Sequence, residues 1–286
     1  MSSSARIKLI VTGDMEKGAI CDFLKRFFPG MRNDQKVIWD SSKIGGVTTH
    51  RLEPAKKLYD PMKRLVKAMI AEAMIGKTGR PADLVVVLDD VELNNLGQES
   101  VVAQVLKNAV EDELVQRNSA TRTVLRDKCS FYLFKPMVEA YLFGDANALE
   151  IACVQAPHNP RLVHPTDVEQ FETNDPAYLI HCKQENNTKK QKDNAPWWRE
   201  ECHAKHYLEH LTKGSYKETD HGKEALKEIN WKNVPKCHSD MPIIRSLFQD
   251  ISDWFGIPNP LGAGSFDPIF YPANPVNRSN LLLRNL

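Results

Sequence analysis

Short apolar runs alternate with helical periods over the first 150 residues. Residues 7–11, 84–88 and 129–134 are runs of the kind that form buried parallel strands. In residues 54–75 and 98–116 the apolar positions recur every three to four residues, which predicts two amphipathic helices. Strands that alternate with helices at this spacing predict an α/β fold with a mainly parallel central sheet flanked by helices.

Shorter segments complete this pattern. Residues 16–28 predict an amphipathic helix that ends at Pro29-Gly30, with Asp14 as its N-cap. Residues 36–40 and 47–52 have strand character, and residues 137–143 start another helix.

The pattern changes after about residue 150. Residues 183–195 are polar and predict a mobile surface loop, and helices resume at about 200–212 and 242–255. The segment 257–286 is rich in proline, so we expect it to lie extended along the body. We therefore predict an α/β core at residues 1–150 and a C-terminal helical and extended region at residues 151–286 that packs on it.

Composition narrows the class of protein. The 286 residues are 42% hydrophobic and 26% charged with a net charge of +1, as in ordinary soluble proteins, and this charge demands no nucleic-acid partner. No apolar run approaches the roughly 20 residues that span a membrane, and the N-terminus does not read as a signal peptide. The six cysteines show no CxxC spacing, so we expect reduced thiols and a cytoplasmic protein without a membrane partner.

Acidic residues follow each of the three predicted core strands. Their positions are Asp14 and Glu16, then Asp89, Asp90 and Glu92, then Glu139. The carboxyl ends of parallel strands are where open α/β sheets bind ligands. Carboxylate oxygens suit Mg²⁺ or Mn²⁺, and converging acids would suit one or two such ions in phosphoryl transfer.

Helix capping alone could account for some of these acids. Asp14 and Glu16 lie where helix capping and the helix dipole favour acids, so capping and metal binding both stay open for them. The position of Asp89 and Asp90 at the end of a buried strand favours a functional role. Glu139 lies among apolar residues, where a carboxylate needs a partner.

In order and spacing, these parts resemble the TOPRIM (topoisomerase–primase) domain. They are most similar to stand-alone relatives of the overcoming-lysogenization-defect nucleases of bacterial defence loci. Residues 10–20 (IVTGDMEKGAI) resemble the first family motif, and residues 85–93 (VVVLDDVEL) resemble the second. Three later segments are also similar: KPMVEAYLFGD at 135–145, HAKHYLEHL at 203–211 and MPIIRSLFQDISDWF at 241–255. The resemblance covers about residues 7–255.

The resemblance implies a TOPRIM-like nuclease that uses Mg²⁺ or Mn²⁺ to hydrolyse phosphodiester bonds of DNA or RNA in anti-phage defence. It implies metal ligands among Asp14, Glu16, Asp89, Asp90 and Glu92. It implies catalytic roles for Glu16, Asp89, Asp90, Glu139 and Lys205. Arg245 matches a basic residue of the family and, with Lys205, would offset phosphate charge.

Two departures from the family pattern support an alternative. Thr12 stands where the first motif has a glutamate, and the Asp-x-Asp motif reads either as Asp89 with Val91 or as Asp90 with Glu92. The alternative is a catalytically degenerate TOPRIM-like subunit that binds a partner ATPase, a nuclease or a phage protein. For either function, the oligomeric state stays open.

A histidine-rich segment offers a different chemistry. Cys202, His203, His206 and His210 lie on one predicted helix, and spacings of four residues suit zinc, with Cys182, Cys237 or His238 completing the set. The same histidines would also fit a polar helix face, or a phosphate contact by Lys205 and His206. Trp197 and Trp198 follow a lysine-bearing segment and either stack on bases or anchor the next helix.

Overall fold

A five-stranded sheet forms the centre of the computed structural model, which describes residues 4–54, 60–76, 79–157, 159–180, 200–232, 241–271 and 280–286. The strand order is β2-β3-β1-β4-β5. The strands are β1 (Ala5–Val11), β2 (Met31–Arg32), β3 (Gln35–Lys43), β4 (Leu84–Asp90) and β5 (Cys129–Phe134). β1 pairs in parallel with β3 and β4, and β4 pairs in parallel with β5, while the short β2 is antiparallel to β3.

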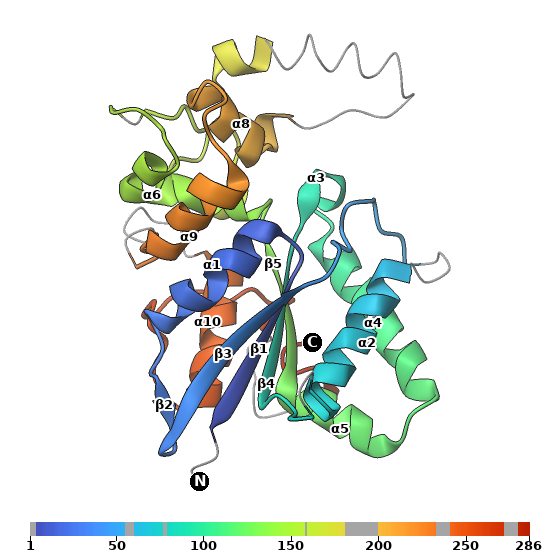
Figure 1. The fold of residues 1–286 in the computed structure, drawn as a ribbon. Helices are drawn as coiled ribbons and strands as arrows, with labels where there is room; N and C mark the ends of the chain where they lie inside the picture. The colour runs from blue at the N-terminus through green and yellow to red at the C-terminus, as the bar shows by residue number, and fades with distance from the viewer. Residues whose placement is uncertain are drawn as a thin grey trace.

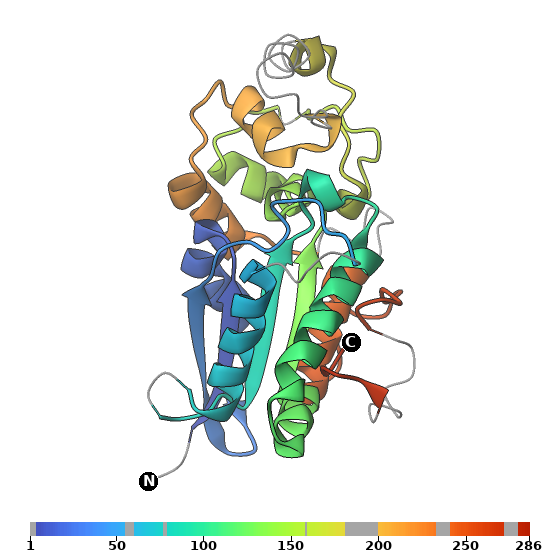
Figure 2. The same cartoon turned by 90° about the vertical axis from the view of Figure 1, so that its right-hand side faces the viewer.

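Helices cover both faces of this sheet (Figure 1). One face carries α1 (Asp14–Lys25) and α10 (Pro242–Phe255), and the other carries α2 (Asp60–Met74), α4 (Glu99–Val115) and α5 (Ser119–Lys128). Figure 2 shows the second group in front of the strands. Every residue of β1 and β5 is buried, as expected for strands covered on both faces. The predicted α/β class with a mainly parallel sheet is therefore confirmed.

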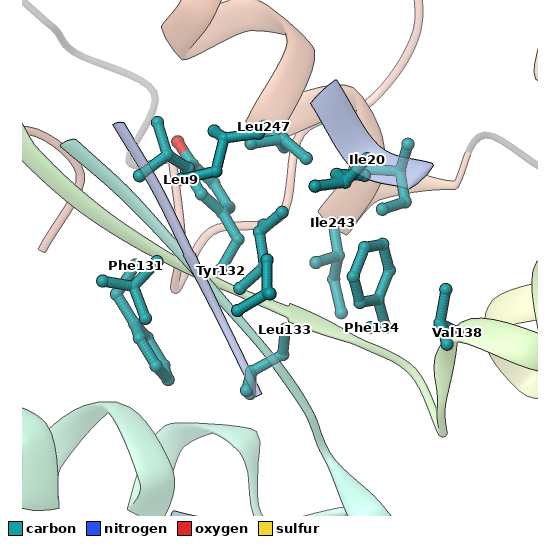
Figure 3. Packing of buried hydrophobic residues seen from close by; sticks show 14 of the residues in the cluster. Leu9, Ile20, Phe131, Tyr132, Leu133, Phe134, Val138, Ile243 and Leu247 are labelled. Atoms are coloured by element: carbon teal, nitrogen blue, oxygen red, sulfur yellow. The ribbon is translucent and has the colours of Figure 1, made fainter. Parts of the chain in front are cut away.

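The core on the α1 face joins distant parts of the chain. Leu9 and Phe134 from the strands pack with Ile20 from α1 and with Ile243 and Leu247 from α10 (Figure 3). α10 belongs to the layer next to the sheet although it lies beyond residue 150.

The remaining elements are short and gather mainly beyond the carboxyl ends of the strands (Figure 1). They are α3 (Glu92–Asn95), η1 (Val138–Gly144), α6 (Ala146–Ile151), η2 (Val168–Gln170), η3 (Glu200–Cys202), α8 (Ala204–Leu211), η4 (Glu218–Gly222) and α9 (Lys223–Glu228). α9 packs against α1 and α6, so this group is joined to the core through the first helix.

Several local predictions were wrong. The predicted strand at residues 47–52 forms no regular element. The first helix begins at Asp14 with Gly13 as its N-cap and ends at Lys25, so Asp14 is not the N-cap. α3 and α5 were not predicted, and α2 is described only from Asp60. The predicted loop at 183–195 lies outside the described residues.

No helix within the described ranges is long and apolar enough to cross a membrane.

Candidate functional site

The carboxyl ends of β1, β4 and β5 open into a pocket of about 340 Å³. The chain leaves β1 for β3 on one side of it and returns to β4 on the other, so the strand order reverses between β1 and β4. Open α/β sheets bind ligands at this kind of switch point. Of the residues that the structure describes, six acidic ones line the pocket: Glu16, Asp89, Asp90, Glu92, Glu139 and Glu218.

Glu16 is the least solvent-exposed of these acids. It lies in the first turn of α1, its side chain is 1% exposed, and its Oε1 has no hydrogen-bond partner among the described residues. Burial, followed by the charges of Glu218 and Asp89, raises the pKa of Glu16 to about 7. A Cβ at position 13 would collide with the Glu16 carboxylate, so the glycine makes room for it.

Asp90, Glu92 and Glu139 bring further negative charge to the same space. Oδ1 of Asp90 accepts a hydrogen bond from the Val138 backbone N–H at 2.9 Å, which ties β4 to η1. Burial, followed by the charges of neighbouring carboxylates, raises the pKa of Asp90 well above its usual value. Burial also raises the pKa of Glu92, and raises that of Glu139 to about 8. These shifts show that carboxylates have been placed where their charge is poorly compensated.

Asp89 has a different environment from its neighbour. Its Oδ1 accepts hydrogen bonds from Thr12 Oγ1 at 2.5 Å and from the Asp90 N–H at 3.0 Å. Its Oδ2 accepts from the Val47 N–H at 3.0 Å and from Thr48 Oγ1 at 3.1 Å. Both oxygens are therefore engaged by the protein itself, and they hold the segment 44–52 against the strand ends.

Asn95 holds the same segment from α3, and sequence reasoning missed it. Its Oδ1 accepts from the Leu52 N–H at 2.9 Å, and its Nδ2 donates to the carbonyls of Thr48 at 2.7 Å and His50 at 3.0 Å. These contacts explain why residues 47–52 form no strand. They place Gly46 and Thr49 on the pocket wall. The sequence offered no signal beyond an asparagine close to the acidic motif.

Among the described residues that line the pocket, Lys205 is the only lysine or arginine. Its Nζ donates to Glu218 Oε2 at 2.5 Å. Burial works against the charge of Lys205, but the hydrogen bond to Glu218 and the charge of Glu139 outweigh it, so its pKa is raised. Glu218 was not predicted, because no periodicity or motif marks residue 218 as a neighbour of the strand ends.

Two residues that the sequence predicted for the site lie outside the pocket. The Asp14 side chain is 53% exposed, pairs with Lys43 at 2.5 Å and does not line the pocket. Arg245 is buried in α10, where its Nη1 donates to the carbonyls of Leu261 at 3.0 Å and Gly262 at 2.8 Å. The structure therefore brings together Glu16, Asp89, Asp90, Glu92, Glu139 and Lys205, but neither Asp14 nor Arg245.

The histidines of the zinc hypothesis are divided by the fold. The rings of His203 and His206 stack with centroids 3.5 Å apart and both line the pocket, whereas His210 packs beside Tyr178 and Tyr207. Cys182, Cys237, His238, Trp197 and Trp198 lie outside the described residues. No group of three or more His, Cys, Asp or Glu residues within the described part of the chain is arranged to hold a metal ion.

The donor chemistry of the pocket nevertheless fits a hard divalent cation. Carboxylate oxygens are the ligands that Mg²⁺ and Mn²⁺ prefer. Oε1 of Glu16 has no hydrogen-bond partner among the described residues, and burial raises the pKa values of Glu16 and Glu139, as expected for carboxyl groups whose negative charge is poorly compensated. The fold and the site thus define an α/β protein with an acidic pocket at the switch point of its sheet. Comparisons with protein-family models, curated proteins and solved structures found no match.

Proposed function

We propose that this chain is a TOPRIM-like nuclease that uses Mg²⁺ or Mn²⁺ to hydrolyse phosphodiester bonds of DNA or RNA, in bacterial anti-phage defence. The observation that carries the proposal is the pocket at the switch point, where six carboxylates face one lysine in the described lining. The family and the defence role rest on the sequence motifs, and the cation rests on the charge of the pocket.

The charge balance of the pocket favours a cation. Burial and mutual repulsion raise the pKa values of Glu16, Asp90 and Glu139, so each is costly to ionise without a positive partner. These three residues, with Glu92, would hold the ion. A bound divalent ion supplies an activated water and neutralises charge on a phosphoryl group.

Lys205 would contact the phosphate. Its ammonium group donates to Glu218, which lines the same pocket, and the charge of Glu139 also acts on it. A lysine beside a carboxylate cluster provides the positive charge that an anionic diester needs when it enters an acidic site.

Calorimetric titration of Mn²⁺ tests the cation site directly. We expect saturable binding to the wild type and loss of at least tenfold in affinity in the double variant Glu16→Gln/Asp90→Asn, which removes charge but little volume. Asp14→Asn is the matched control, because Asp14 lies outside the pocket and should leave binding unchanged. Absence of saturable binding to the wild type, or equal binding by the double variant, would overturn the proposal.

The degenerate subunit is the second candidate, and one contact favours it. Thr12 stands at the position of the family glutamate, and its neutral hydroxyl donates a hydrogen bond to Asp89. Asp89 in turn holds the backbone of Val47, so neither position offers a free carboxylate to a metal ion. A subunit of this kind would co-purify in fixed stoichiometry with a partner ATPase or nuclease and would show no Mn²⁺-dependent cleavage.

A further inference from the structure

A carboxylate–imidazole pair lies on the rim of the acidic pocket, on the side formed by η3 and α8. His206 lines the pocket, and its Nδ1 lies 3.0 Å from Oε2 of Glu200. The histidine side chain is 38% exposed, whereas that of Glu200 is 8% exposed. The pair therefore joins a buried carboxylate to an imidazole that reaches the cavity.

The support of this pair is also buried. The hydroxyl of Tyr178, which is 2% exposed, donates to the same Oε2 of Glu200 at 3.2 Å. On the other side of the imidazole, the His203 ring stacks on His206 with an interplanar angle of 11°. Two contacts thus fix the plane and the rotation of one imidazole ring, more than a purely solvated histidine requires.

Nδ1 of His206 faces Glu200, so Nε2 is the nitrogen that is available to a ligand in the pocket. A carboxylate that binds one ring nitrogen fixes the tautomer and the orientation of the other. With Nδ1–H donated to the Glu200 carboxylate, Nε2 is an acceptor in the neutral ring and carries an N–H in the imidazolium form, and the imidazolium is the form that a general acid uses. A general acid needs this arrangement in order to reach a leaving oxygen.

We propose that His206 in its imidazolium form, oriented by Glu200 and Tyr178, is the general acid that protonates the leaving-group oxygen of a phosphodiester. The inference rests on the proposed nuclease function and assigns a residue to one of its steps. Neither the TOPRIM resemblance nor the acidic motifs assign this step to a histidine.

The proposed step conserves atoms and charge. The oxygen of a water molecule forms the new bond to phosphorus, and the proton of that water passes to solvent. The bond between phosphorus and the leaving oxygen breaks with its electron pair on the oxygen, which takes the proton from Nε2 of the His206 imidazolium and leaves a neutral ring whose Nδ1–H stays on Glu200. Solvent then returns a proton to His206, so the products are a phosphomonoester and an alcohol.

Other charged groups share the environment of His206. Glu200 and His203 contact it directly, Lys205 precedes it on α8, and Glu92, Glu139 and Glu218 line the same cavity. A pH profile alone would mix all of these groups. Sensitivity to the leaving group isolates the proposed step, because a good leaving group needs no protonation.

Two thymidine diesters provide this test. The leaving group of the dinucleotide TpT is a nucleoside alkoxide, whereas that of the p-nitrophenyl ester of thymidine 5′-monophosphate is p-nitrophenolate. With Mn²⁺ present, His206→Gln should lose on the order of 100-fold or more in kcat on TpT, but less than about tenfold on the nitrophenyl ester. Glu200→Gln should show the same selective loss to a smaller extent. His210→Gln, on the same helix but outside the pocket, should change neither rate.

The outcomes separate the two proposals. If the wild type hydrolyses neither diester with Mn²⁺, the nuclease proposal is overturned, and the assignment of His206 is overturned with it. If the wild type is active and His206→Gln loses equally on both diesters, the residue has a structural role and only the general-acid assignment is wrong. Thermal unfolding of each variant accompanies the kinetics, so that loss of the fold is read separately.

Discussion

Asp89 and Asp90 are neighbours in the chain, but their carboxylates have different partners and different roles. Asp89 is 2% exposed and accepts four hydrogen bonds, three of them from groups in Thr12, Val47 and Thr48. Asp90 accepts a hydrogen bond from the Val138 N–H and also faces the acidic pocket. The first residue therefore maintains the shape of the pocket, and the second contributes to its charge.

Replacement of Asp89 by alanine should destabilise the fold. The change leaves the Val47 N–H and the Thr48 hydroxyl buried without an acceptor, and each such group costs about 1–3 kcal/mol. We expect a loss of about 3 kcal/mol in the free energy of unfolding, measured by urea denaturation. Asp90→Asn keeps the volume and lowers repulsion, so it should not destabilise the protein. An Asp89→Ala variant as stable as the wild type would contradict this role.

Stability should depend on pH through Glu16 and Glu139. Their pKa values rise from a usual 4.5 to about 7 and about 8 in the fold. Between pH 4.5 and 8 the folded state therefore keeps protons that the unfolded chain releases, and the free energy of unfolding falls as the pH rises. Glu139→Gln should remove part of this slope and be more stable than the wild type at pH 8, by on the order of 2 kcal/mol.

Thermal unfolding of the wild type and Glu139→Gln from pH 4.5 to 8.5 measures this effect. The two proteins should have similar stability near pH 4.5 and diverge above it. Parallel curves over the whole range would show that Glu139 ionises normally in the fold.

Among the elements, the sequence predicted the positions of the buried strands β1, β4 and β5. β5 occupies the predicted residues 129–134, and β1 and β4 extend the predicted runs by two residues, because apolar runs covered on both faces have few alternatives. Residues 47–52 have strand-like alternation, but Asp89 and Asn95 take their backbone groups instead of a neighbouring strand. That competition depends on contacts across about 40 residues, which a local pattern does not contain.

The residues of the candidate site likewise fall into a group that the sequence predicted and a group that it did not. Glu16, Asp90 and Glu139 follow predicted strands, and the geometry of a parallel sheet brings such positions together. Glu218 and the pair of Glu200 with His206 come from a part of the chain without strand periodicity. Their approach to the pocket depends on the packing of η4 against α1 and of α8 against η1, tertiary contacts that sequence spacing does not reveal.

Glu169 should control the start of α10. Its carboxylate accepts from the backbone N–H groups of Ile243 at 3.2 Å and Ile244 at 3.0 Å, and from the Tyr141 hydroxyl at 3.1 Å. It thus serves as an N-cap supplied by a distant segment. Glu169→Ala should lower the free energy of unfolding by about 2–3 kcal/mol. The exposed Gln170→Ala is the control, and equal urea midpoints for the two variants would refute the capping role.

For the molecule as a whole, the last residues complete the edge of the sheet. β5 is an outer strand, and its free edge meets the segment 283–286. Asn285 accepts from the Phe131 N–H at 3.1 Å and donates to the Phe131 carbonyl at 2.7 Å, as a neighbouring strand would. The Arg284 guanidinium pairs with the buried Asp250 of α10 at 2.9 Å. The same short segment therefore covers a strand edge and neutralises a charge under the sheet.

Removal of residues 282–286 should weaken the whole molecule. The deletion leaves Asp250 buried without its cation, a change that costs about 3–5 kcal/mol in comparable buried pairs. It also exposes the N–H and carbonyl of Phe131 on an apolar edge strand, which favours pairing with another chain. We expect a fall of at least 3 kcal/mol in the free energy of unfolding, with concentration-dependent self-association detected by light scattering. Asn280→Ala, at an exposed position just before the segment, should cause neither effect. A truncated protein that stays monomeric and as stable as the wild type would show that β5 needs no cover at this edge.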